Sequence, residues 1–249
     1  MRGLSVAVAT ALIAAPASAE ELPLADHPLV DTIVRVEDGA TVDREALRAA
    51  LADAKFVVLG EKHDNPRHHA IQAELVEDLG RRGDLEAVAF EMLPRDSQLD
   101  VTAHVQGGGD AAGLADAVGW GELGWGPWTW YGPIADAALR HDATLVAADI
   151  GREDARAIYR DGFDALDAEF VARTGLDRPL DPADREARVA AMVEAHCGHD
   201  LGGMADAMVD VQRARDAMLA DRLARLTDDG RGVLITGNGH AVTDTGAPA

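Results

Sequence analysis

The chain alternates short apolar runs with longer amphipathic segments. The short runs are rich in β-branched and other apolar side chains, which predicts strands at 55–59, 87–90, 144–148 and 232–236. Apolar residues recur every three or four positions over 43–54, 67–82, 94–105 and 133–140, and from 154 to 226 only helices are predicted. This order predicts an α/β fold: a mostly parallel sheet flanked by helices, with a largely helical insertion before the last strand.

Two of the predicted strands end in the same motif. Gly-x-x-His follows the first strand as Gly60 to His63 and the last strand as Gly237 to His240. Ligands of open α/β sheets bind beyond the carboxyl ends of parallel strands, and a glycine there lets the backbone turn tightly. We therefore expect both histidines to face one pocket. The alternative is that they only cap loops or bond backbone carbonyls.

Further polar side chains follow the strands at the same predicted edge, namely Glu61, Glu91, Asp149, Arg152 and Asn238. Imidazole and carboxylate groups serve as general acids and bases. The candidate catalytic residues are therefore Glu61, His63, Glu91, Arg152 and His240. Two imidazoles and a carboxylate also bind divalent transition metals such as Mn, Co or Zn, which makes His63, Glu91 and His240 candidate metal ligands. Glu91 could instead be only the ion-pair partner of Arg152 or of a helix N-terminus.

Aromatic residues are concentrated in one segment. They make up 4% of the chain, yet all four tryptophans lie between Trp120 and Trp130, and Tyr131 follows directly. A large flat apolar ligand such as haem would stack on this segment, and tyrosine is one of the ligands of haem iron. We therefore expect Tyr131 as the axial ligand. The alternative is that these aromatic side chains cover the core.

Histidines and arginine complete the candidate haem site. His63, Arg152 and His240 are the groups expected to bind the propionates. His196 and His199 lie three positions apart, a spacing that lets two histidines share one metal, and His196 is the further candidate cofactor ligand. The pair His68 and His69 opens a predicted helix, in which His68 is expected to be partly buried and His69 to be on the surface.

Composition and charge limit the partners and the compartment. The formal net charge of −21 repels nucleic acid and anionic lipid, so neither is expected as a partner. Residues 1–19 have the pattern of a secretory signal peptide, with Arg2, an apolar stretch and Ala17-Ser18-Ala19. No stretch is long and apolar enough to span a membrane. We expect one domain over 20–249 in a periplasmic or secreted protein, without a disulfide because Cys197 is the single cysteine.

These residues resemble the ChaN-like haem-binding uptake proteins of the Tiki superfamily. The matching blocks run in order along the chain: 57–65 with His68, His69 and Gln72; 89–92 with Gln98; Trp128-x-x-Tyr131-x-Pro133; 147–152; His196-Cys197-Gly198; Gln212-x-x-Arg215-Asp216-Ala217; and Gly237-x-x-His240 with Gly246-x-Pro248. The resemblance implies haem binding, iron ligation by tyrosine at the motif-matched Tyr131, and dimers that stack two haems. Tyr159 is the other tyrosine of the chain.

The wider superfamily offers a second interpretation. Its erythromycin-esterase-like and TraB/Tiki members share two Gly-x-x-His motifs with a Glu and an Arg, and some are metal-dependent hydrolases. By this resemblance the positions are His63, His240, Glu91 and Arg152. The first hypothesis is thus an exported haem-binding protein of haem or iron uptake, for which the resemblance implies a homodimer. The alternatives are a metal-dependent esterase or peptidase, and a structural or partner-binding domain. The family domain normally continues past Gly246-x-Pro248, so we expect truncation at the C-terminus.

Overall fold

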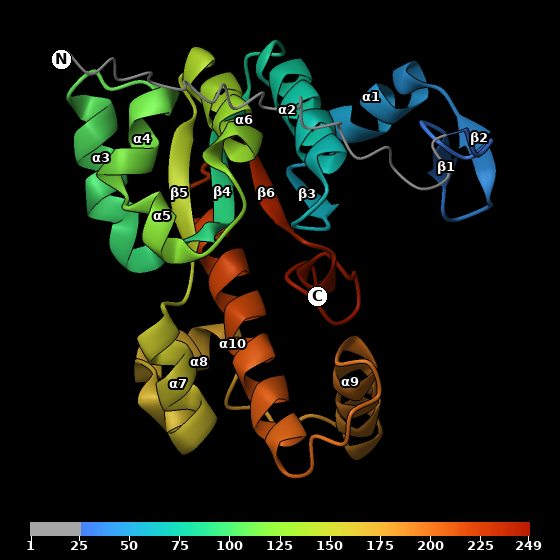
Figure 1. Ribbon diagram of the computed structural model, residues 1–249, viewed down its shortest axis with the longest axis vertical. Coiled ribbons are helices and arrows are strands. Elements are labelled where there is room, and N and C mark those ends of the chain that lie inside the picture. Colours follow the sequence, from blue (N-terminus) through green and yellow to red (C-terminus); the bar gives the residue numbers. More distant parts are fainter. Residues whose placement is uncertain (1–25) are drawn as a thin grey trace, which may run out of the picture. The chain divides into compact units, whose positions relative to one another are not determined.

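Four parallel strands organise residues 48–249 (Figure 1). They are β3 (Phe56–Glu61), β4 (Leu85–Pro94), β5 (Thr144–Asp149) and β6 (Arg231–Gly237), and they pair in the order β3-β6-β4-β5. The computed structural model describes residues 26–249, so the predicted signal peptide lies outside the described residues. The last strand lies inside the sheet, between β3 and β4. The predicted α/β fold with a mostly parallel sheet is confirmed.

Helices cover the two faces of this sheet. On one face lie α2 (Pro66–Gly80) and α6 (Trp128–Arg140), followed by the smaller α3 (Gln98–Gln106), α4 (Ala111–Ala117) and α5 (Trp120–Leu123). On the other face lies α10 (Met204–Arg225). Alternation along β4 serves both layers, because Val88 and Phe90 face the α2–α6 core whereas Ala87 and Ala89 face α10. The small alanines let α10 approach the sheet closely.

The insertion before β6 is helical, as predicted. It contains α7 (Arg152–Asp161), α8 (Ala168–Thr174), α9 (Pro182–Ala195) and α10, with a short 3₁₀ turn at Gly162–Ala165. Another 3₁₀ turn, Asn238–His240, follows β6. α10 extends well beyond the sheet in Figure 1. Its Leu219 and Leu223 pack on the strands, whereas Ala214 and Met218 join a separate core with Ile158 of α7. α9 buries none of its side chains and is attached to α10 through Arg185, which bonds Asp206 and Asp210.

Residues 26–47 contain a small hairpin. β1 (Ile33–Arg35) and β2 (Ala40–Val42) pair antiparallel, and α1 (Arg44–Ala52) follows. Asp38 in the connecting turn accepts a hydrogen bond from the side chain of Arg35 at 2.9 Å and from the backbone of Ala40 at 3.1 Å. Among the helices from residue 26 onward, none is long and apolar enough to cross a membrane.

Candidate functional site

The two Gly-x-x-His motifs interlock at the carboxyl ends of β3 and β6. These strands are neighbours, with Glu61 paired to Gly237. A side chain at Gly237 would place its Cβ 2.7 Å from Nε2 of His63, and one at Gly60 would place it 2.7 Å from Oδ1 of Asn238. Each motif's first glycine therefore makes room for the other motif. This close approach brings both histidines to one edge of the sheet.

Glu61 is the centre of the first polar network. Its Oε1 lies 2.8 Å from Nδ1 of His63 and accepts a hydrogen bond from the hydroxyl of Tyr131 at 3.0 Å, and its Oε2 lies 2.9 Å from Nδ1 of His69. Burial raises the pKa of Glu61, but His63 and His69 outweigh burial and lower it to about 2. Glu61 in turn raises the pKa of His63. The network therefore favours a carboxylate facing imidazolium.

Glu91 is the centre of the second network, on the α10 face of the sheet. Its Oε2 accepts hydrogen bonds from the hydroxyl of Thr236 at 2.7 Å and from the backbone of Gly237 at 2.6 Å. Its Oε1 accepts one from Arg215 at 2.8 Å and lies 3.5 Å from Nε2 of His240. Burial raises the pKa of Glu91, but the charges of His240 and Arg215 lower it below its usual value.

Arg215 and His240 each hold a further buried carboxylate. Arg215 donates to both oxygens of Asp149, with a shortest distance of 2.6 Å. Nδ1 of His240 lies 2.6 Å from Oδ1 of Asp216. Burial raises the pKa of both Asp149 and Asp216. The two networks meet where Nε2 of His63 lies 3.9 Å from Oε1 of Glu91.

Four of the five predicted catalytic residues thus come together, and Arg152 lies outside their networks, although it lines the same pocket as Glu91. Glu61, His63, Glu91 and His240 share the two networks described above. The guanidinium of Arg152 is exposed and donates to the carbonyl of Leu123 at 2.6 Å. Arg215 of α10 lies beside Glu91 instead. Arg215 belongs to the motif Gln212-x-x-Arg215-Asp216, which matches the family. The argument from strand ends considered only residues that follow strands, so it did not select a residue within a helix.

The predicted metal ligands His63, Glu91 and His240 do not have metal-site geometry. Both oxygens of Glu91 already accept hydrogen bonds, and Arg215 brings a positive charge to its Oε1. Between residues 26 and 249, no group of three or more His, Cys, Asp or Glu side chains is arranged to hold a metal ion. The donor set as arranged therefore does not fit Mn, Co or Zn.

The side chains of the aromatic segment cover the core. This was the alternative to a surface on which haem stacks. Tyr131 is 0% exposed, and burial followed by the charge of Glu61 raises its pKa. Trp120 packs edge-on to Trp128 with ring centroids 4.7 Å apart, and Trp130 stacks on His69. A buried phenol that donates to a carboxylate is poorly placed to bind iron, so the expectation for Tyr131 is not supported by its environment.

The prediction that His68 is partly buried is confirmed, whereas the prediction that His69 lies on the surface is wrong. His69 is 0% exposed, whereas His68 is only partly buried and bonds the loop through the backbone of Lys62 at 2.9 Å. Because α2 begins at Pro66, with Asn65 as its N-cap, the first turn points His69 toward Glu61. Nε2 of His69 also lies 3.3 Å from the carbonyl of His63. Both ring nitrogens face oxygen atoms, which explains why Glu61 outweighs burial and raises the pKa of His69.

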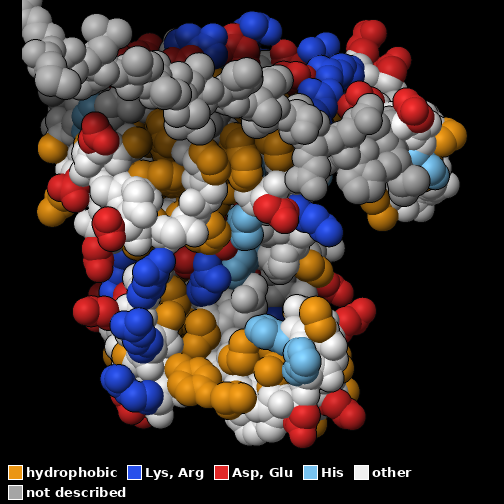
Figure 2. All heavy atoms as spheres, in the orientation of Figure 1, with side chains coloured by type: hydrophobic (Ala, Val, Ile, Leu, Met, Phe, Trp, Pro, Cys, Tyr) orange, Lys and Arg blue, Asp and Glu red, His pale blue; other side chains and the backbone are white. Residues whose placement is uncertain are grey.

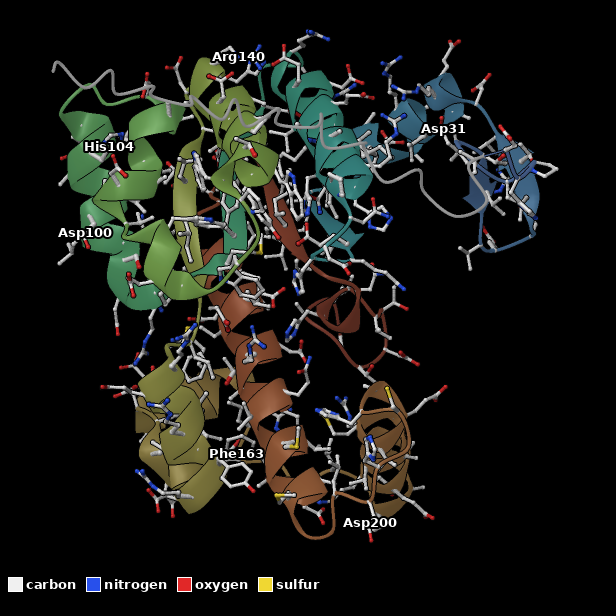
Figure 3. The ribbon with its side chains drawn as sticks, in the orientation of Figure 1. Asp31, Asp100, His104, Arg140, Phe163 and Asp200 are labelled. Atoms are coloured by element: carbon white, nitrogen blue, oxygen red, sulfur yellow. The ribbon has the colours of Figure 1, made fainter. Side chains whose placement is uncertain are left out.

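A separate groove lies between the helices of the insertion. Its floor is one face of α10, and α7 and α9 form its walls; the lining residues are Ala155, Arg156, Tyr159, Arg160, Met192, His196, Met208, Val211, Gln212 and Arg215. Its volume is about 540 Å³. Figure 2 shows basic side chains along α7, histidine on the α9 side and hydrophobic side chains between them. Figure 3 labels Phe163, which follows α7, and Asp200, in the loop between α9 and α10; neither residue lines the groove.

The sequence identifies the protein family. Residues 47–249 match the sequence profile of the family described as haem-binding uptake, Tiki superfamily, ChaN. The chain belongs to this family. No curated protein matched the sequence. The fold is similar to that of a solved structure described as cofacial haem binding to ChaN of Campylobacter jejuni, with a TM-score of 0.67, 19% identity and coverage of 87% of this chain and 83% of that one.

A second solved structure, that of the type III effector HopBA1, matches with 14% identity and coverage of 78% of this chain and 71% of that one. Its TM-score of 0.40 is too low to indicate a shared fold. Tyr159, which the sequence analysis named only as the other tyrosine of the chain, lines the groove. The available signal was its position between Arg156 and Arg160 in an acidic chain.

Proposed function

We propose that this ChaN-family chain binds haem in the groove formed by α7, α9 and α10, with Tyr159 as an iron ligand. The observation that carries the proposal is the combination found there: an exposed tyrosine and arginines on one wall, and an apolar floor. The volume of about 540 Å³ lies within the range of about 300–1,000 Å³ typical of cofactor and ligand pockets. The family supports haem as the ligand.

Tyr159 suits iron better than Tyr131 does. The side chain of Tyr159 is 40% exposed and projects from α7 into the groove, whereas Tyr131 is fully buried. A phenolate ligand favours iron in the ferric state, and the bound haem would provide that iron. At Tyr159 a phenolate would face the open groove. At Tyr131 the negative charge would face Glu61 in the interior, which is unfavourable.

The groove also offers groups for the two propionates. Arg152, Arg156 and Arg160 follow each other at intervals of four residues, so they lie along one side of α7. Arg156 and Arg160 line the groove. A guanidinium binds a carboxylate through two parallel hydrogen bonds. On the floor, Met208 and Val211 give the macrocycle an apolar surface, since residues three or four apart share one face of α10.

The test is an absorption titration of the apo protein with haemin, compared between two tyrosine variants. Tyr159→Phe is expected to lose the charge-transfer band of a tyrosinate-ligated ferric haem and to weaken binding at least about 10-fold, or about 1.4 kcal/mol. Tyr131→Phe is expected to keep both the band and the affinity, because its hydroxyl bonds Glu61 in the interior. The reverse result would return the site to Tyr131 and the aromatic segment.

A role in haem or iron uptake outside the cytoplasm is part of the proposal. It is supported by the family and by the signal-peptide pattern of residues 1–19. Cell fractionation with N-terminal sequencing tests it. The expected result is a periplasmic or secreted protein that begins at Glu20. A protein that keeps Met1 and remains in the cytoplasm would contradict the proposed location.

Hydrolysis at the sheet edge is the second candidate function. The observation that favours it is His63, a half-exposed imidazole that bonds Glu61 and lies against Trp125 with ring centroids 4.8 Å apart. A neighbouring pocket of about 670 Å³ reaches Glu91, Arg215 and Trp125. An activated ester supplied with and without Mn, Co or Zn tests this function. Activity that His63→Ala abolishes would support it, and activity equal in both proteins would refute it.

A further inference from the structure

We propose that another pocket, formed by α8, α9, α10 and residues 245–249, binds an α-amino acid with an apolar side chain. Its volume is about 400 Å³, within the range of about 300–1,000 Å³ typical of small-molecule sites. On α10 its lining runs from Arg213 to Ala224, whereas the lining of the groove runs from Met208 to Arg215, and the two pockets have no lining residue in common. This pocket is therefore separate from the proposed haem site.

Charged side chains of both signs line the pocket, with arginine in excess. The arginines are Arg173, Arg188 and Arg213, and the carboxylates are Asp216 and Asp221. Arg173 is neutralised by Asp221, because its Nε and Nη2 donate to the two carboxylate oxygens at 2.8 and 3.1 Å. Arg188 and Arg213 are therefore the cations that remain for an acidic ligand.

Both of these arginines donate to neutral backbone groups. Nη1 of Arg188 bonds the carbonyl of Thr245 at 2.9 Å, and Nη2 of Arg213 bonds the carbonyl of Arg178 at 3.1 Å. Nη1 of Arg213 is 3.8 Å from Asp210, which is beyond hydrogen-bond distance. Burial lowers the pKa of Arg213, and the nearby charge of Arg188 lowers it further, against the effect of Asp210. Each guanidinium thus has N–H donors left for the oxygens of a carboxylate.

Two buried polar atoms of the lining residues have no hydrogen-bond partner among residues 26–249. They are Nε of Arg188, a donor, and Oδ2 of Asp216, an acceptor. Oδ1 of Asp216 is already paired with Nδ1 of His240 at 2.6 Å, so Oδ2 is the oxygen left for a ligand. Unsatisfied buried donors and acceptors destabilise a fold. A ligand that carries an anionic acceptor and a cationic donor a few bonds apart would satisfy both atoms.

These two requirements select an α-amino acid among small anions. Its carboxylate would bind Arg188 and Arg213, and its ammonium group would bind Oδ2 of Asp216. Phosphate would bring more negative charge next to Asp216 and no cation, and a simple carboxylate would leave Oδ2 without a donor. Leu180 and Ala220 also line the pocket, so an apolar side chain of the ligand would be removed from water there.

Calorimetric titration of the full chain tests the proposal with L-leucine, N-acetyl-L-leucine, L-leucine methyl ester and inorganic phosphate. L-Leucine is expected to form a one-to-one complex. Acetylation removes the ammonium group and esterification removes the carboxylate, so each is expected to weaken binding about 10-fold or more. Binding of either derivative or of phosphate as tight as that of L-leucine would overturn the proposal. Absence of binding by all four probes would also overturn it and would mean that ordered water alone satisfies the buried atoms.

Arg188→Gln tests the location of the site. It is expected to bind L-leucine about 10-fold or more weakly than wild type and to keep the wild-type affinity for haemin, because Arg188 does not line the groove. Arg82→Gln removes an exposed arginine outside both pockets, and this control is expected to bind L-leucine as wild type does. Unchanged L-leucine binding by Arg188→Gln would overturn the proposal. The comparison of the four probes on wild type does not depend on how the variant folds.

Discussion

His240 and Asp216 form a buried pair in which Nδ1 of the imidazole lies 2.6 Å from Oδ1 of the carboxylate. Asp216 sits on α10, and His240 follows β6, so the pair connects the helix to the end of the central strand. The same ring directs Nε2 toward Glu91 at 3.5 Å. Asp216 therefore fixes the orientation of the histidine from the second Gly-x-x-His motif.

Replacing Asp216 is expected to destabilise the fold. Asp216→Ala removes the buried carboxylate acceptor of Nδ1 and leaves the side-chain nitrogen of Gln212, 2.9 Å away, as its neighbour, which costs about 1–3 kcal/mol. Asp216→Asn keeps an acceptor and is expected to cost less. Urea denaturation of the apo proteins measures both. Haem affinity is expected to be unchanged in Asp216→Asn, since Asp216 does not line the groove. Equal stability of Asp216→Ala and wild type would mean that the pair contributes nothing.

The close approach of the two Gly-x-x-His motifs predicts that one added methyl group lowers the stability of the fold. Gly237→Ala would place Cβ 2.7 Å from Nε2 of His63, so the ring or the strand must shift at a cost of about 1–3 kcal/mol. Gly121→Ala in α5 is the matched control, because nothing lies within 4 Å of its added Cβ. The control is expected to be neutral or to stabilise by about 0.4–1 kcal/mol. Similar melting temperatures for both variants would rule out the close approach.

The alternation of apolar residues predicted the strands but not their neighbours. β4 extends over Leu85–Pro94, beyond the predicted 87–90, because Glu91 stays within the strand and is satisfied by Thr236 and Gly237 of β6. The order β3-β6-β4-β5 depends on which strands pair, and residues 61 and 237 are too distant in the sequence for a local pattern to show that they pair.

The candidate site shows the same limit. Strand-end reasoning found Glu61, His63, Glu91 and His240, because parallel strands end at a common edge. It could not find Arg215 or His69, whose positions depend on how α10 and α2 are rotated. The sequence could not show that the aromatic segment is buried, since hydrophobic side chains near a ligand and those of a core look alike in sequence. Exposure separates them: Tyr131 is 0% exposed and Tyr159 is 40% exposed.

Arg215 is expected to be essential for the stability of the sheet edge. It donates to Glu91 at 2.8 Å and to Asp149 at 2.6 Å, both of them buried. Arg215→Met leaves two buried carboxylates without their cation, which costs about 3–5 kcal/mol. Without Arg215, the pKa of Asp149, which burial already raises, would rise further, and the pKa of Glu91 would lose one of the charges that lower it. The variant should therefore recover stability as the pH falls. Denaturation near neutral and mildly acidic pH measures this, and a loss independent of pH would contradict it.

The Glu61 network predicts a window of pH in which it stabilises the fold. Burial is outweighed by His63 and His69, so the pKa of Glu61 falls from 4.5 to about 2, and its contribution is lost as the pH falls through that value. Glu61 raises the pKa of His63 and His69 above 6.5, so their contribution is complete below 6.5 and is lost as the pH rises through the folded values. The network therefore stabilises the fold most between pH 4.5 and pH 6.5.

Glu61→Gln tests that window. It is expected to destabilise by about 3–5 kcal/mol near pH 5.5, because it leaves a buried histidine without its carboxylate. At alkaline pH, above the raised pKa values of His63 and His69, both histidines are neutral, so the difference between variant and wild type should be smaller. Urea denaturation at the two pH values gives the comparison. A difference of the same size at both would show that the histidines do not become charged in the folded protein.

Arginines of α7 predict how haem binding depends on salt. Arg156 and Arg160 line the groove and would bind the propionates, although the chain as a whole carries a charge of −21. Removing both by alanine substitution is expected to weaken haemin binding about 10-fold or more at low ionic strength. The loss should shrink as salt is added, because salt screens exposed charges over a Debye length of about 10 Å at 0.1 M.

The control for this prediction is Arg82→Ala, which removes an exposed arginine that does not line the groove. It changes the net charge in the same direction, so it reports the long-range effect of charge alone. Iron ligation should be intact in the double variant, because Tyr159 is retained, and the charge-transfer band of bound haem should be unchanged. If Arg82→Ala weakens binding as much as the double variant does, haem responds to the overall charge and the propionates do not lie along α7.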